Sequence, residues 1–112
     1  MIAKKIAEII AEVSGVSTEQ ASSCIYDPLE FAGRDDYWKN AMIENDHDEA
    51  SVIALVTHDG EPLNKYFYSQ FGTPEEREKQ GKMWNAFRNA GLWFESYSCW
   101  YVAVREDRKH VS

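Results

Sequence analysis

The chain has 112 residues, a net charge of -7 at neutral pH, 44% hydrophobic residues and two cysteines. This length gives room for one compact domain over residues 1–112, which excludes a Rossmann enzyme and a TIM barrel. Its four Trp, six Tyr and five Phe residues can fill one hydrophobic core without a metal or a disulfide framework, which excludes a disordered chain.

The cysteines and the amino terminus indicate the compartment. Cys24 and Cys99 form no C-x-x-C pair and fit buried thiols in a reducing environment, although a single bridge between them stays open. The apolar run near the amino terminus is interrupted by Glu8 and Glu12, so it is neither a signal peptide nor a membrane span. We therefore expect a cytoplasmic protein with no membrane partner.

The first quarter of the chain predicts two helices. Isoleucines recur at helical spacing over residues 1–14, which predicts an amphipathic helix with one buried stripe. Ser17 follows, and Gln20 three positions later completes a capping-box pattern, which predicts a second short helix as far as Ile25. We therefore expect residues 1–26 to form a helical hairpin.

This hairpin resembles the helix-turn-helix of lactose-repressor-type DNA-binding proteins. The matching positions are Ala11, Gly15, Val16, Ser17 and Ser22. In that family the second helix enters the major groove, so the resemblance implies a DNA-binding regulator that uses residues 2–25. However, residues 17–30 carry three acids and neither Lys nor Arg, whereas cationic contacts supply most non-specific DNA affinity. We do not expect direct nucleic-acid binding, and the regulator is kept as the alternative function.

The second half of the chain predicts a β-β-α-β unit over residues 51–105. Residues 52–56 are rich in β-branched side chains and end at a His-Asp-Gly turn signal, and the aromatic run 65–71 follows. These two runs predict a β-hairpin. Thr73 and Pro74 then form a strong helix start.

The last helix and strand have clear sequence boundaries. The helix is predicted to run to about Ala90, and Gly91 is expected to close it in a left-handed conformation. Residues 92–104 are aromatic on both faces, which predicts one long strand placed centrally in the sheet. Residues 106–112 form a tail.

The expected fold class is α+β. Two amino-terminal helices precede an acidic irregular segment over residues 27–50, and the β-β-α-β unit forms a small sheet of about three strands with helices packed on it. Within the acidic segment, Asp35 to Ile43 is predicted to form one or two helical turns capped by Asp35 or Asp36.

The acidic segment contains the excess charge. Residues 17–50 hold nine acids and two bases, a net charge of -7, whereas residues 1–16 and 51–112 each sum to zero. We expect the partner-binding residues to be Asp35, Asp36, Tyr37, Trp38, Glu44, Asp46, Asp48 and Glu49. Closely spaced carboxylates can imitate the phosphates of DNA, and embedded aromatic residues are typical of interfaces. Two alternatives stay open, namely a solvated loop that favours solubility and core packing of Trp38.

No catalytic, metal or cofactor site is predicted. Asp46, His47, Asp48 and Glu49 have the donors for a cation, but Ser51 stands where an EF-hand loop needs glycine. Neither cysteine has a neighbouring group that would orient a histidine base. The strand aromatics lack the basic groove of a stacking platform for single-stranded nucleic acid. We therefore expect neither an enzyme nor a cofactor.

These observations together favour a small acidic non-catalytic protein. We expect it to bind, and thereby inhibit or regulate, a basic or nucleic-acid-handling protein. In size and charge it is similar to inhibitors encoded by phages and mobile elements, including anti-restriction and anti-CRISPR proteins. This similarity is an analogy of general character and rests on no motif.

Overall fold

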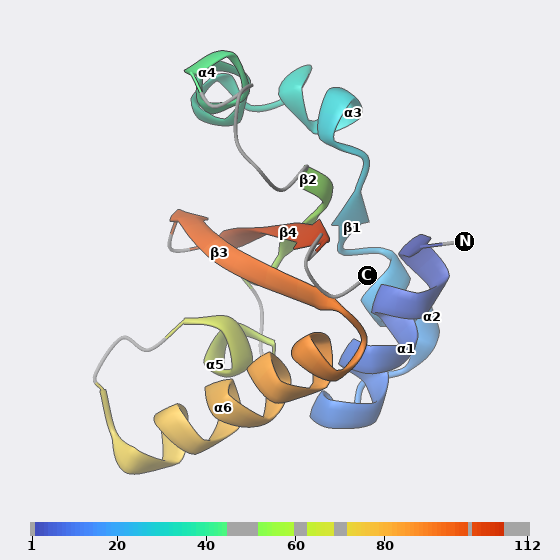
Figure 1. Ribbon diagram of the computed structural model, residues 1–112, viewed down its shortest axis with the longest axis vertical. Coiled ribbons are helices and arrows are strands. Elements are labelled where there is room, and N and C mark those ends of the chain that lie inside the picture. The colour runs from blue at the N-terminus through green and yellow to red at the C-terminus, as the bar shows by residue number, and fades with distance from the viewer. Residues whose placement is uncertain (1, 45–51, 60–62, 69–71, 99, 107–112) are drawn as a thin grey trace.

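The structure is a computed structural model that describes residues 2–44, 52–59, 63–68, 72–98 and 100–106 (Figure 1). It is an α+β fold, as predicted, but the helices surround a four-stranded antiparallel sheet of order β1-β2-β4-β3, where about three strands were expected. The strands are β1 (Ile25–Tyr26), β2 (Val52–Thr57), β3 (Leu92–Ser98) and β4 (Tyr101–Glu106). The helices are α1 (Ile2–Ser14), α2 (Thr18–Ser22), α3 (Pro28–Ala32), α4 (Asp36–Glu44), α5 (Asn64–Phe67) and α6 (Pro74–Asn89).

The amino-terminal hairpin forms as expected, but its second helix is shorter. Gly15 has a φ of 83° between α1 and α2, and the Ser17 hydroxyl accepts a hydrogen bond of 3.1 Å from the Gln20 backbone N–H. The prediction that this helix reaches Ile25 is wrong. Ile25 and Tyr26 form β1 and pair with β2, because β-branched and aromatic residues are stabilised by a strand partner that sequence pattern alone does not show.

The segment that was expected to be irregular contains two helices. Asp27 caps α3 by accepting hydrogen bonds from the Leu29 and Glu30 backbone N–H groups at 3.0 and 3.3 Å. Pro28 takes the first helical position, where its missing N–H costs nothing. The helical turns predicted from Asp35 are confirmed as α4. Residues 45–50 of this segment lie outside the described residues.

The predicted hairpin between residues 52–56 and 65–71 is wrong. The first run is β2, but Asn64–Phe67 forms α5, and β2 pairs with β1 and β4 instead. Leu63 and Phe67 are both buried, and their spacing of four residues places them on one face of a helical turn. A helix brings these two apolar side chains within about 6 Å of each other along its axis, whereas in a strand they would share a face but lie about 13 Å apart.

The single long strand predicted over residues 92–104 is a pair of strands. β3 ends at Ser98 and β4 begins at Tyr101, and the two pair in antiparallel fashion. The sequence between them contains neither Gly nor Pro, so the usual turn signal is missing. The central position was correctly predicted for β4, which lies between β2 and β3.

The long helix α6 follows its sequence signals closely. Thr73 and Glu76 form the capping box, with hydrogen bonds of 3.1 and 3.2 Å, and Pro74 begins the helix. Gly91 follows the helix with a φ of 78°. Opposite charges four residues apart form ion pairs along this helix, from Lys79 to Glu75 and from Lys82 to Glu78.

Both faces of the sheet are covered by apolar side chains. On one face Val102 and Val104 of β4 pack with residues of α1, α5 and α6, and on the other face Tyr101 and Ala103 pack with residues of α3 and α4. Alternation along a strand produces these two sets. Figure 1 shows the same division, with α5 and α6 at one end of the molecule and α3 and α4 at the other.

His58 is a buried titratable group beside Phe67, on the face of the sheet that α1, α5 and α6 cover. Its side chain is 1% exposed, its ring stacks on Phe67 with centroids 5.5 Å apart, and its Nδ1 lies 3.4 Å from the Asn64 amide nitrogen. Its Nε2 has no hydrogen-bond partner among the described residues. Burial, which disfavours the imidazolium, lowers the pKa of His58 below its ordinary value of 6.5, against smaller opposite effects of a backbone hydrogen bond and Asp59.

The lowered pKa of His58 predicts a pH-dependent stability. Below pH 6.5 the unfolded chain takes up a proton at this residue more readily than the folded chain does, so the free energy of unfolding should fall as the pH decreases from 7.5 to 5.5. In the His58→Gln variant this contribution should be absent. Urea unfolding of both proteins across this range checks the prediction, which is wrong if their stability difference does not change with pH.

Candidate functional site

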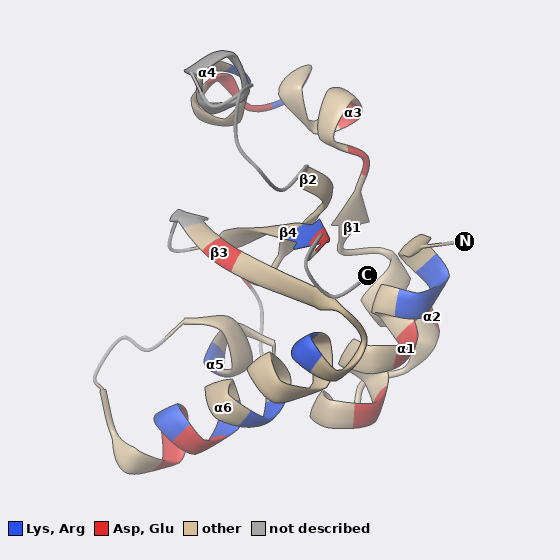
Figure 2. Ribbon diagram, viewed as in Figure 1, with Lys and Arg blue, Asp and Glu red and all other residues tan. Residues whose placement is uncertain are grey.

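The predicted partner-binding residues that the structure describes lie on one unit, residues 27–44, which we call the α3–α4 unit. It stands at one end of the molecule (Figures 1 and 2). Glu44 is the last residue of α4. Asp46, Asp48 and Glu49 lie outside the described residues, so their position relative to this unit stays a prediction.

Two aromatic residues attach the α3–α4 unit to the sheet. Phe31 and Trp38 are buried, with Trp38 1% exposed, and both pack with Leu55, Tyr101 and Ala103. The Phe31 ring meets the Tyr101 ring edge to face at 5.0 Å. The Trp38 indole N–H donates a hydrogen bond of 3.0 Å to the Pro28 carbonyl, which ties α4 to α3. Trp38 is therefore a core residue, and its side chain is not available to a partner.

Asp35 has a structural role as well. Its Oδ2 accepts a hydrogen bond of 2.9 Å from the Trp38 backbone N–H, which caps α4, and another of 2.9 Å from the Tyr101 hydroxyl. A carboxylate that accepts both bonds stabilises the helix start and the contact with β4 at once. Two of the eight predicted residues, Asp35 and Trp38, therefore hold the unit in place.

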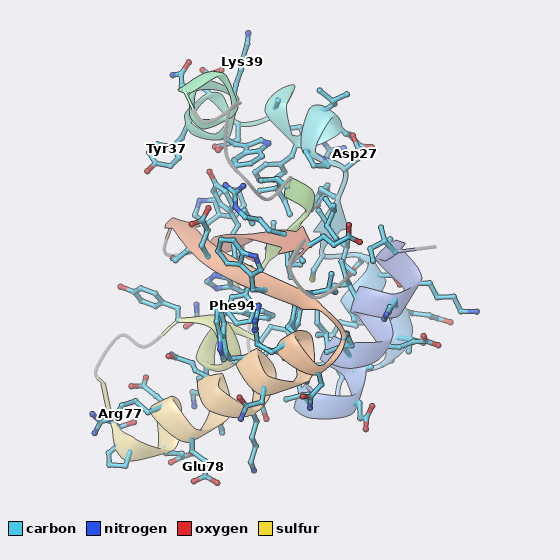
Figure 3. All side chains as sticks on the ribbon, viewed as in Figure 1. Asp27, Tyr37, Lys39, Arg77, Glu78 and Phe94 are labelled. Carbon is cyan, nitrogen blue, oxygen red and sulfur yellow. The ribbon has the colours of Figure 1, made fainter. Side chains whose placement is uncertain are left out.

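The outer surface of the α3–α4 unit exposes large apolar side chains. Leu29 is 74% exposed and Tyr37 is 63% exposed, more than any other large apolar residue described. Asp36 beside Tyr37 is exposed, and its carboxylate forms no hydrogen bond or ion pair with the described residues. Figure 3 shows Tyr37 and Lys39 projecting outward from α4. Single exposed apolar residues are ordinary, but an aromatic side chain beside polar residues, such as Tyr37 beside Asp36, is common at interfaces.

Leu29 was not among the predicted partner-binding residues, although the sequence contains a signal for its exposure to solvent. Leu29 and Phe31 are two positions apart in α3, so they point to roughly opposite sides of the helix. Since Phe31 is the bulkier apolar side chain and is buried, Leu29 is left in solvent.

The acids of residues 17–50 are not gathered on the α3–α4 unit alone. Glu19 belongs to α2, which packs against α1. Asp27 caps α3, and Glu30 lies 4.0 Å from Arg34. This last pair is well exposed on both sides, so it contributes little to stability. Figure 2 shows acids on α3 and α4 and mixed charges on α6.

The structure also describes the helix that the resemblance to a DNA-binding hairpin singles out. α2 has five residues, and β1 begins three residues after its end. Its sequence, Thr-Glu-Gln-Ala-Ser, contains one acid and no base. The hollow between α1 and α2 is lined by Lys4, Glu8 and Glu19 among others, so charges of both signs border it. This surface lacks the cationic character that phosphate contacts require.

Comparison with protein families, with characterised proteins and with solved structures finds no match for this chain. In the part of the chain that the structure describes, no three His, Cys, Asp or Glu side chains come together in a way that could hold a metal ion. None of the described helices is both long enough and apolar enough to cross a membrane. The site must therefore be interpreted from its geometry.

The two hydrogen bonds of Asp35 predict a difference between neighbouring acids. Asp35→Ala should lower the free energy of unfolding by about 2–3 kcal/mol, because it removes a helix cap and a charge-assisted hydrogen bond. Tyr101→Phe should cost about 1–2 kcal/mol, since it removes only the second bond. The control Asp36→Ala should change stability by less than about 0.5 kcal/mol. Urea unfolding followed by tryptophan fluorescence measures all three, and equal losses for Asp35→Ala and Asp36→Ala would contradict the assignment.

Proposed function

We propose that this protein is a non-catalytic binding protein that captures a protein partner with a basic surface. The contact surface is the outer side of the α3–α4 unit, together with the acidic residues Glu44, Asp46, Asp48 and Glu49 that end and follow it. The observation that supports this proposal is the exposure of Leu29 and Tyr37 on a unit whose inner side is fixed in the core.

Fixing the unit before binding favours affinity. Because Trp38, Phe31 and Asp35 hold α3 and α4 against the sheet, the Tyr37 ring and the Leu29 side chain are presented without ordering of the backbone on binding. Tyr is among the residues that contribute most to binding energy when a partner covers them. Tyr37 is accordingly the proposed anchor of the interface.

The charge of the segment supplies steering rather than anchoring. Asp36 and the acids from Glu44 to Glu49 raise the encounter rate with a basic partner, and salt screens this effect. A basic or nucleic-acid-handling protein in the cytoplasm fits this chemistry. Binding there would inhibit or regulate that partner by covering its cationic surface, and an inhibitor encoded by a phage or mobile element is the form of this function that size and charge favour.

The exposed apolar side chains give the first test. The Leu29→Ser, Tyr37→Ser double variant should lose capture of the partner from a host lysate, because the anchors are removed while the buried side of the unit is unchanged. The control is Ile2→Ser, which alters an exposed apolar residue of α1, outside the α3–α4 unit. Quantitative pull-down with the immobilised chain measures capture. Equal capture by the double variant and the unmodified chain would exclude this surface.

Two triple charge-reversal variants distinguish the effect of the charge in the acidic segment from the effect of the protein's net charge. The first variant changes Asp46, Asp48 and Glu49 to Lys and should abolish capture at physiological salt. The matched control changes Glu8, Glu12 and Glu19 to Lys, which alters the net charge by the same amount, and it should retain capture. Equal loss would show that net charge alone matters. Retention of duplex DNA at low salt by the unmodified chain, lost on Gln20→Ala and Ser22→Ala, would instead support the alternative regulator.

A further inference from the structure

A hollow of about 300 Å³ lies at the other end of the molecule, between α5, α6 and β3. It is lined by Phe67, Arg77, Gln80, Gly81, Trp84 and Phe94. Figure 3 shows Phe94 projecting from β3 toward the two helices and Arg77 near the start of α6. We propose that this hollow binds a small aromatic carboxylate, a molecule with one or two fused rings and one acid group.

The aromatic walls of the hollow are fixed by contacts with one another. The Phe94 ring meets the rings of Phe67, Trp84 and Phe87 edge to face, with centroids 5.1, 5.2 and 5.0 Å apart. Trp84 nevertheless remains 40% exposed, although an indole is a large apolar group to leave in water. A flat aromatic ring placed in the hollow would pack against these rings in the same geometries.

Gly81 leaves the open space in the helical wall. It lies in the interior of α6, where glycine weakens a helix relative to alanine. Neither crowding nor backbone conformation requires glycine here, because a Cβ built on Gly81 meets no heavy atom within 4 Å and its φ is not positive. A side chain at this position would therefore extend into open space beside the hollow that Gly81 lines.

The polar groups that line the hollow favour an anion. Along α6, Lys79 forms an ion pair with Glu75, and Lys82 forms one with Glu78. The Thr73 backbone N–H donates a hydrogen bond to the Glu76 carboxylate. Arg77 forms no ion pair with any residue that the structure describes. The Gln80 Nε2 is buried and likewise lacks a hydrogen-bond partner there.

These properties together define the class of ligand. The Arg77 guanidinium can bond to a carboxylate, while the rings select a planar apolar group. The volume of about 300 Å³ lies at the lower end of the range for ligand sites. A monocyclic or bicyclic aromatic acid meets all three conditions.

Titration of the full ¹⁵N-labelled chain with indole-3-acetate tests the proposal. The Gly81 amide and Trp84 indole signals should shift in a saturable way. The neutral probe indole-3-acetamide should bind roughly tenfold more weakly, because it loses the charge-assisted bond. Arg77→Gln should weaken indole-3-acetate binding by a similar factor and remove the preference for the acid. The matched control Arg88→Gln, on the same helix, should bind like the unmodified chain.

Filling the hollow gives an independent test. Gly81→Leu places a side chain in the open volume and should abolish the shifts, with far-ultraviolet circular dichroism used to confirm the fold. Because Arg77 is exposed, its variant tests the proposal even if the leucine variant does not fold. Shifts that do not saturate, undiminished binding to folded Gly81→Leu, or equal affinity for the acid and the amide would each overturn the proposal.

Discussion

The contact between Tyr101 and the α3–α4 unit is the constraint on which the rest of the structure depends. β4 is one of the two inner strands, and its residues from Tyr101 to Arg105 are buried, so both of its faces need a cover. Helices α1, α5 and α6 supply residues to the cover of one face. On the other face Phe31 and Trp38 pack on Tyr101, and the Asp35 carboxylate accepts the hydrogen bond of the tyrosine hydroxyl. Without this cover, the side chains on that face of β4 would be exposed to water.

This constraint divides the roles of four consecutive residues. Asp35 and Trp38 point toward the sheet, where one accepts hydrogen bonds and the other fills the core. Asp36 and Tyr37 are exposed, since a helix turns by about 100° per residue and cannot bury all four. The residues that attach the unit are thus interleaved with those proposed to bind a partner.

Local signals in the sequence predicted the structure well, and pairing between distant segments was missed. The helix start at Thr73 and the left-handed Gly91 depend on neighbouring residues, and both are confirmed. The strand β1 and the helix α5 depend on β2 and on the core, which no local pattern contains. For the candidate site, composition singles out a segment, but only the packing of Trp38 and Leu29 separates buried from exposed side chains.

Formal charge along the sequence is also a poor measure of the charge offered to a partner. Of the described acids in residues 17–50, Asp27 and Asp35 cap helices, Glu30 lies near Arg34, and Glu19 belongs to another helix. A carboxylate that already accepts backbone hydrogen bonds has less of its field available to a partner. Under the proposed function, charge on the α3–α4 unit would steer a basic partner, and the shape and apolar surface of Leu29 and Tyr37 would add to the selection among such partners.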